Sequence, residues 1–260
     1  MKLKSIILLS LILLIAGNIF AQKTDPPKDP VKPAEVKTPQ AAKLPAVSEV
    51  LAKYVKAIGG REANEKIKSR VQKGGVELSP MNIKGTAEVY AAAPDKSLVV
   101  LNIAGIGEIR EGYDGKTAWS INPIQGNRDK TGQELMQVKL ASNFYREINL
   151  EKLYSKMEVK GTEKVGDKEA YVVIGTAEGV PNDTLYFDTG SGLLVRSDTT
   201  AISPEGSTNT TTYYEDYREQ DGVMVPFKVR TILPQFAIIS TFTEVKNNVV
   251  VEDAKFQKPK

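Results

Sequence analysis

Residues 184–198, TLYFDTGSGLLVRSD, decide the fold class of this 260-residue chain. Strand-forming side chains dominate both flanks, 184–188 and 193–198. The segment between the flanks, Asp188 to Gly192, consists of residues that favour turns. Because two strands joined by so short a turn must run antiparallel, the stretch predicts a β-hairpin.

The same hairpin pattern recurs on both sides of this stretch. An Asp-Gly pair between β-rich runs is the strongest short-range hairpin signal, and it occurs at Asp114-Gly115 and Asp221-Gly222. The spacing predicts about ten or eleven antiparallel strands, and hence a mainly β fold with helices (α+β), a curved antiparallel sheet or incomplete β-barrel. Other turn signals lie at 94–96, 165–168 and 203–206, and other strand-forming runs at 98–103, 170–175, 223–231 and 238–245.

An amphipathic helix is expected before the first strand. Apolar residues recur between positions 47 and 58 at the spacing of one helical face. Ala46 or Ser48 opens this helix, and Gly59-Gly60 permits it to end. A short polar helix around 61–68 follows. The apolar positions are Val47, Val50, Leu51, Tyr54, Val55 and Ile58.

A second helical segment is expected in the middle of the chain. Thr131 and Glu134 have the spacing of a capping box, in which Thr131 is the N-cap and Glu134 reaches back to it. Apolar residues then lie along one side of the helix as far as Tyr145, and a short piece around 150–156 continues it after a bend. This helical insertion and the N-terminal helix are expected to cover the sheet.

The first 45 residues have the character of a leader and a linker. Lys2 and Lys4 precede an apolar run at 6–15, which is too short to span a bilayer, and Ala21 is a small residue suited to cleavage. We expect a signal peptide at 1–21 that is cleaved near Ala21, with an uncleaved anchor as the alternative. Six prolines and five lysines predict a disordered linker at 22–45, either a spacer or a Pro-rich ligand, before a β domain at 46–260.

The chain contains no His and no Cys, so it lacks the commonest catalytic and metal-binding side chains. The net charge of +3 comes from lysines of the leader and the linker, so the domain is close to neutral and gives no argument for nucleic-acid binding. We therefore expect a protein that is not an enzyme and has no cofactor, no metal and no nucleic-acid partner. Among enzymes, a carboxylate-based hydrolase remains the alternative.

One motif resembles an active site but is better interpreted as a turn. Residues 186–191, YFDTGS, are similar to the aspartic-protease motif, in which two aspartates share a proton. That chemistry requires a second Asp-Thr-Gly, and the chain has only the one at Asp188. We therefore interpret Asp188 to Gly192 as the turn of the first hairpin.

Three motifs and their order resemble the LolA-type superfamily of periplasmic carriers, which includes outer-membrane lipoprotein-sorting proteins. They are YDGKTAW at 113–119, the hairpin at 185–196, and the segment from Tyr217 through Pro226-Phe227. The opening helix at 50–67 is similar to that of a secreted bacterial subfamily. The resemblance covers roughly residues 46–258 and implies an incomplete β-barrel, covered by helices, whose concave side holds acyl chains.

The resemblance implies a periplasmic, non-catalytic carrier for a lipid or acyl ligand, or for a lipoprotein, that does not span the membrane after cleavage. The alternative is an envelope protein-interaction or sensing module with a protein partner and the same fold. Side chains at alternate positions of a strand share one face of the sheet, and this alternation indicates candidate cavity-lining side chains. Ordinary core packing predicts the same alternation. The candidates are Leu98, Val100, Trp119, Phe144, Leu185, Phe187, Phe227, Val229, Phe236, Ile238 and Phe242.

Overall fold

The computed structural model describes residues 44–259, so the predicted signal peptide and most of the predicted linker lie outside the described residues. The strands are β1 (Ser69–Ser79), β2 (Ile83–Ala92), β3 (Lys96–Ile103), β4 (Gly107–Tyr113), β5 (Ala118–Asn122), β6 (Gly126–Lys130), β7 (Lys156–Val165), β8 (Lys168–Thr176), β9 (Asp183–Asp188), β10 (Leu194–Ser203), β11 (Gly206–Gln220), β12 (Val223–Ile232) and β13 (Ala237–Asn247). The helices are α1 (Val47–Ala57), α2 (Gly60–Lys66), α3 (Gly132–Ser142), η1 (Arg146–Ile148), α4 (Leu150–Leu153) and η2 (Asp253–Phe256).

All the strands of the described region form one antiparallel sheet in the order β6-β5-β4-β3-β2-β1-β13-β12-β11-β10-β9-β8-β7. Two meanders, β1 to β6 and β7 to β13, are joined by the pairing of β1 with β13. The predicted mainly β fold, with an open and curved sheet, is confirmed. The predicted number of ten or eleven strands is wrong, because the sheet has 13.

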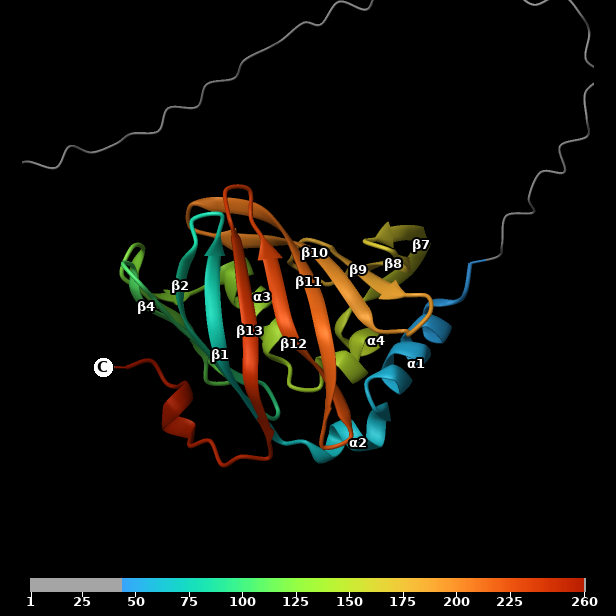
Figure 1. Cartoon of the computed structure of the whole chain (residues 1–260), viewed down its shortest axis with the longest axis horizontal. Helices are drawn as coiled ribbons and strands as arrows, with labels where there is room; N and C mark the ends of the chain where they lie inside the picture. The colour runs from blue at the N-terminus through green and yellow to red at the C-terminus, as the bar shows by residue number, and fades with distance from the viewer. Residues whose placement is uncertain (1–43, 260) are drawn as a thin grey trace, which may run out of the picture. The chain divides into compact units, whose positions relative to one another are not determined.

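The helical insertion crosses from one edge of the sheet to the other. The edge strands β6 and β7 are consecutive in the chain and are separated by α3, η1 and α4. The sheet curves around α3, which lies behind β12 and β13 in the view of Figure 1. The insertion therefore covers the concave face.

The N-terminal helix α1 packs on the second meander. Val50, Leu51 and Tyr54 are buried, as the predicted apolar stripe requires, and they join Leu185 and Phe187 of β9 in one core cluster. The Tyr54 and Phe187 rings lie 5.0 Å apart between centroids. Each such buried side chain stabilises the fold by about 1.5–3 kcal/mol relative to exposure.

The outer face of the first meander is covered by the C-terminal segment. Trp119 of β5 and Leu98 of β3 are buried beneath Phe256 of η2. The Trp119 Nε1–H donates a hydrogen bond to the Phe256 carbonyl oxygen at 2.9 Å. This buried bond fixes the end of the chain against the sheet.

The predicted capping box of α3 is wrong in one respect. Thr131 is the N-cap residue, as expected, but its side chain makes no capping hydrogen bond. The Glu134 carboxylate instead accepts two hydrogen bonds from the Arg128 guanidinium, at 2.6 and 2.7 Å. A bidentate, charge-assisted pair is stronger than one bond to a backbone amide, so Glu134 turns toward β6.

Asp188 lies in the turn between β9 and β10, as interpreted from the sequence. Its carboxylate accepts hydrogen bonds from the Gly190 amide, the Ser191 amide and the Ser191 hydroxyl. Burial alone raises the pKa of Asp188, but the Ser191 hydroxyl and the two amides lower it overall. An ionised carboxylate held by its own turn is a structural group.

Candidate ligand-binding groove

The helix α3 is held over the concave face by contacts with both halves of the sheet. The Gln137 side chain donates to the Thr200 carbonyl at 2.6 Å and accepts from the Ile202 amide at 3.0 Å, both on β10. At the other end of α3, the Ser142 and Ser97 hydroxyls are 2.7 Å apart, which connects the helix to β3. The helix thus bridges the two meanders.

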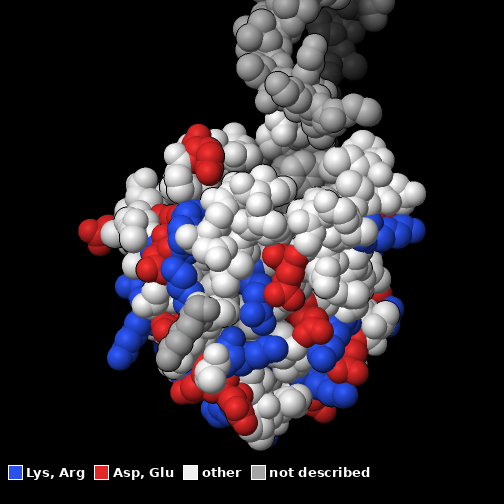
Figure 2. Space-filling view, turned by 90° about the vertical axis from the view of Figure 1, so that its left-hand side faces the viewer, with Lys and Arg blue, Asp and Glu red and all other residues white. Residues whose placement is uncertain are grey.

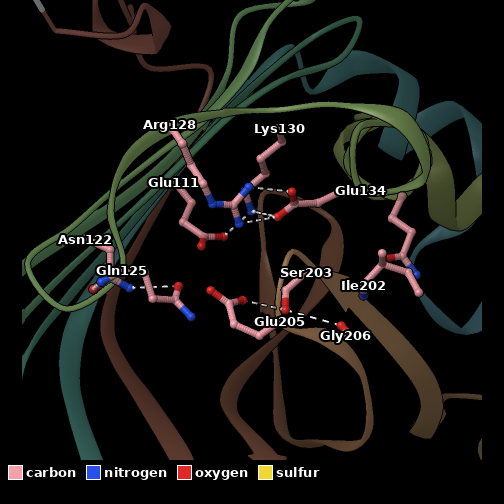
Figure 3. Close-up of polar contacts among 11 residues, drawn as sticks. Glu111, Asn122, Gln125, Arg128, Lys130, Glu134, Ile202, Ser203, Glu205 and Gly206 are labelled. Atoms are coloured by element: carbon pink, nitrogen blue, oxygen red, sulfur yellow. Dashed lines mark hydrogen bonds and ion pairs between the residues drawn. The ribbon is translucent and has the colours of Figure 1, made fainter.

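Charged side chains surround the N-terminal end of α3. Arg128 and Lys130 of β6 contact Glu134, and Lys130 also contacts Glu111 of β4 at 2.9 Å. Figure 3 shows this cluster facing Glu205 of the β10–β11 turn. The hydrogen bond to the Glu134 carboxylate is the main reason why the pKa of Arg128 is raised. The negative charge of Glu205 raises this pKa further. Hairpins from opposite halves of the sheet therefore approach each other at this end of the concave face.

A groove lies between α3 and the concave face of β10 and β11. Its volume is about 390 Å³. Apolar side chains of α3, of β10 and of the loop before β9 line it together with hydroxyl groups of β10 and β11. These side chains include Leu140, Ala141, Val180, Pro181, Ala201, Thr199 and Thr212. We call this feature the groove.

A smaller and more polar cavity lies deeper, between α1, η1 and the sheet. Its volume is about 100 Å³, several times the roughly 10–15 Å³ that one water molecule needs. Tyrosine and arginine side chains supply most of its polar atoms. They are Tyr54, Arg70, Tyr145, Arg146, Tyr214 and Tyr217. We call this feature the polar cavity.

Arg146 stands between the groove and the polar cavity and lines both. Its guanidinium donates to the Tyr154 hydroxyl at 2.7 Å and lies 3.6 Å from Asp183, whose carboxylate accepts the Tyr154 O–H. Burial alone lowers the pKa of Arg146, but Tyr154 and Glu147 raise it overall. Because the positive charge has a carboxylate partner, Arg146 is held in place where the two spaces adjoin.

The architecture of the described region is similar to that of proteins of known structure. No family model matches the chain, and no curated protein matches it. A LolA superfamily protein from Nitrosomonas europaea is similar in structure, with a TM-score of 0.52 at 15% identity over 83% of this chain and 99% of that chain. The chain has the LolA-type fold. A DUF1329 family protein from Desulfovibrio piger has a TM-score of 0.54 at 16% identity, over 81% of this chain and 97% of that chain.

The predicted resemblance to the LolA type is thereby confirmed for the fold. The three motifs that suggested it are hairpins of the sheet: 113–119 joins β4 to β5, 185–196 joins β9 to β10, and 217–227 joins β11 to β12. Identities near 15% compare architecture and carry no ligand from one protein to the other.

The structure brings only some of the predicted cavity-lining residues together. Phe144, Phe227, Val229, Phe236, Ile238 and Phe242 belong to one cluster on the concave side. Leu185 and Phe187 pack under α1, whereas Leu98, Val100 and Trp119 lie on the outer face under η2. Of the eleven candidates, Phe144 alone lines the polar cavity, and none lines the groove.

Sequence reasoning missed the polar residues of the inner face. Arg70 of β1 has the same parity as Val76 and Leu78, which face the concave core, so parity could have placed it there. Tyr214 and Tyr217 both line the polar cavity although their parity differs, because Asp216 between them has a positive φ of 53°. That irregularity has no signal in the sequence, since Asp216 is not a glycine.

The surface of the described region offers no continuous patch of one charge on the face shown in Figure 2, where acidic and basic side chains are interspersed. Among residues 44–259, no group of three acidic side chains is close enough to hold a metal ion. None of the helices in this range has the length and apolar character needed to cross a bilayer.

Proposed function

We propose that this chain is an exported, non-catalytic carrier that shelters an acyl chain or lipid in the groove between α3 and the sheet. The observation that supports the proposal is the groove itself, whose volume of about 390 Å³ falls within the roughly 300–1,000 Å³ of small-molecule sites. The LolA-type resemblance stated from the sequence motifs points to the same class of ligand.

The physical basis of binding is burial of the acyl chain. Each CH₂ group removed from water contributes about 0.8 kcal/mol, so a chain enclosed over several methylenes needs no strong polar contact. Leu140 and Ala141 of the helix line the groove together with Val180 and Ala201. A ligand between them exchanges water for apolar contact on both sides.

The helix α3 acts as the cover in this proposal. The hydrogen bonds of Gln137 to the backbone of β10 and the ion pair of Arg128 with Glu134 fix the cover at separate points. A longer ligand is accommodated by release of these polar contacts, whose net contribution is about 0.5–1.5 kcal/mol for each neutral hydrogen bond. The signal peptide expected at 1–21 places the carrier in the periplasm.

Filling the groove is expected to reduce ligand retention. Ala201 lies on β10 in the groove and is exposed, so Ala201→Trp places a large ring where the ligand lies without disturbing the core. Native mass spectrometry of the mature protein, purified from a periplasmic fraction without detergent, is expected to show lipid or acyl adducts. The adduct fraction should fall about tenfold in Ala201→Trp, the change that corresponds to about 1.4 kcal/mol.

Ala254→Trp is the matched control, because Ala254 is exposed on η2, which packs on the outer face. Its adducts should equal those of the unmodified protein. Equal loss in both variants, or a protein that carries no adduct and takes up no added lipid, would contradict the carrier. A protein partner that co-purifies in stoichiometric amount with a lipid-free chain would instead support the interaction module.

A further inference from the structure

The polar cavity contains hydrogen-bond donors that the described residues leave unused. Tyr54 is only 3% exposed and lines the cavity, yet its hydroxyl makes no hydrogen bond with any of residues 44–259. The hydroxyls of the neighbouring tyrosines are engaged: Tyr214 with Ser197 at 3.1 Å, and Tyr217 with the Leu194 carbonyl at 2.9 Å. Because the Tyr54 hydroxyl opens onto the cavity, it is free to bind a water molecule or a ligand atom there.

Arg70 supplies a second set of donors to the same cavity. Its Nε–H donates to the Asn247 side chain at 2.8 Å, and Asn247 is held in turn by the Gln220 carbonyl and the Asp221 carboxylate. The two terminal amino groups of Arg70 have no hydrogen-bond partner and no carboxylate within 4.0 Å in the described region. Asn247 therefore orients the guanidinium and leaves its outer edge free.

Arg70 forms no direct ion pair in the described region, although Glu147 and Asp221 partly offset the lowering of its pKa by burial. Arg146 has its own partner in Asp183. Glu147 lines the cavity but is exposed and pairs with neither arginine, and Asp221 contacts Asn247 rather than the guanidinium. Burial lowers the pKa of Arg70, but a guanidinium remains protonated in proteins. The outer edge of the Arg70 guanidinium is thus available for a direct ion pair with an anion in the cavity.

We propose that the polar cavity binds the carboxylate of a fatty-acid-type amphiphile, with Arg70 and the Tyr54 hydroxyl as donors and the acyl chain in the groove. The proposal rests on the carrier function and specifies its ligand class. Arg146, Glu147 and Tyr214 line both spaces, so the headgroup site and the groove adjoin. A guanidinium edge presents two parallel N–H groups that match a carboxylate.

The test is isothermal titration of the mature protein with decanoate, with decanol as the neutral ligand of the same chain length, and with acetate as the free anion. The unmodified protein should bind decanoate about tenfold or more tightly than decanol, as expected for a charge-assisted hydrogen bond. Arg70→Gln should remove this preference and leave decanol affinity unchanged. Tyr54→Phe keeps the ring on Phe187 and should weaken decanoate binding about tenfold or more, as for one hydrogen bond to a charged group.

Arg218→Gln is the matched control, because Arg218 of β11 is paired with Asp216 and its side chain is 55% exposed. It should keep the full preference for decanoate. Retained decanol binding shows that each variant is folded. Equal affinity of the unmodified protein for decanoate and decanol would overturn the headgroup site and leave the carrier standing. A folded Arg70→Gln protein that keeps the full preference for decanoate would do the same. If acetate bound as tightly as decanoate, the cavity would be a site for free anions, and the proposal of an amphiphilic ligand would be wrong. Failure of every decyl ligand to bind would refute the carrier as well.

Discussion

Gly74→Ala is expected to destabilise the fold by about 3 kcal/mol or more, whereas the neighbouring Gly75→Ala is expected to have little effect. A Cβ added at Gly74 would lie 2.0 Å from the Thr241 carbonyl oxygen and 2.6 Å from the Phe242 Cα, both backbone atoms of β13. A Cβ at Gly75 would meet nothing closer than 3.8 Å. The backbone of β13 can give way only by breaking its pairing with β1.

This pairing matters because it joins the two meanders. The register of β1 with β13 shifts between Lys73 and Gly74, at a β-bulge that brings the two backbones unusually close. Equilibrium unfolding in urea, with the midpoint and the slope both recorded, measures the two alanine variants against the unmodified protein. Equal stability of the two variants would contradict the β1–β13 register described above.

Trp119→Ala is expected to cost about 3–5 kcal/mol of folding free energy, the range for deletion of a large buried aromatic ring. The Trp119 side chain is only 1% exposed, and its loss also leaves the Phe256 carbonyl without its donor. Urea unfolding again measures the effect. Trp119→Phe keeps an aromatic six-membered ring in the same place, so its cost is expected to be smaller.

The position of Trp119 also makes a prediction about binding. Because Trp119 packs on the outer face under η2, a folded Trp119→Phe protein should carry the same lipid adducts as the unmodified protein. Loss of adducts from this variant would show that Trp119 lines the ligand site, as the sequence suggested, and would contradict the assignment of the groove.

Local signals predicted most of the fold. Each turn signal, including Asp114-Gly115 and Asp221-Gly222, joins consecutive antiparallel strands, and the apolar stripe of α1 is buried as expected. The predicted strand number was too low in part because β6 has only five residues. In β6, the residues are Gly126 to Lys130, which lack any apolar alternation.

The candidate site was much less predictable, because it depends on which face of each strand turns inward. Parity shows that Leu98 and Val100 share a face, but it does not show that this face meets η2 rather than α3. The pairing of β1 with β13 joins residues more than 150 positions apart and has no local signal. Arg70 and Tyr54 are unremarkable in the sequence, and only the tertiary structure brings both into one cavity.

The most direct test of the account is to locate a bound acyl chain by paramagnetic broadening. The mature protein, labelled at its methyl groups, is titrated with stearate that carries a nitroxide near the end of its chain. We predict strong broadening of the methyl signals of Leu140, Val180 and Ala201 in the groove. Little change is expected at Val172 and Val195, which belong to a separate cluster on the other face of β8, β9 and β10. Broadening centred on the outer face, or spread evenly over both faces, would contradict the assignment of the groove as the ligand site.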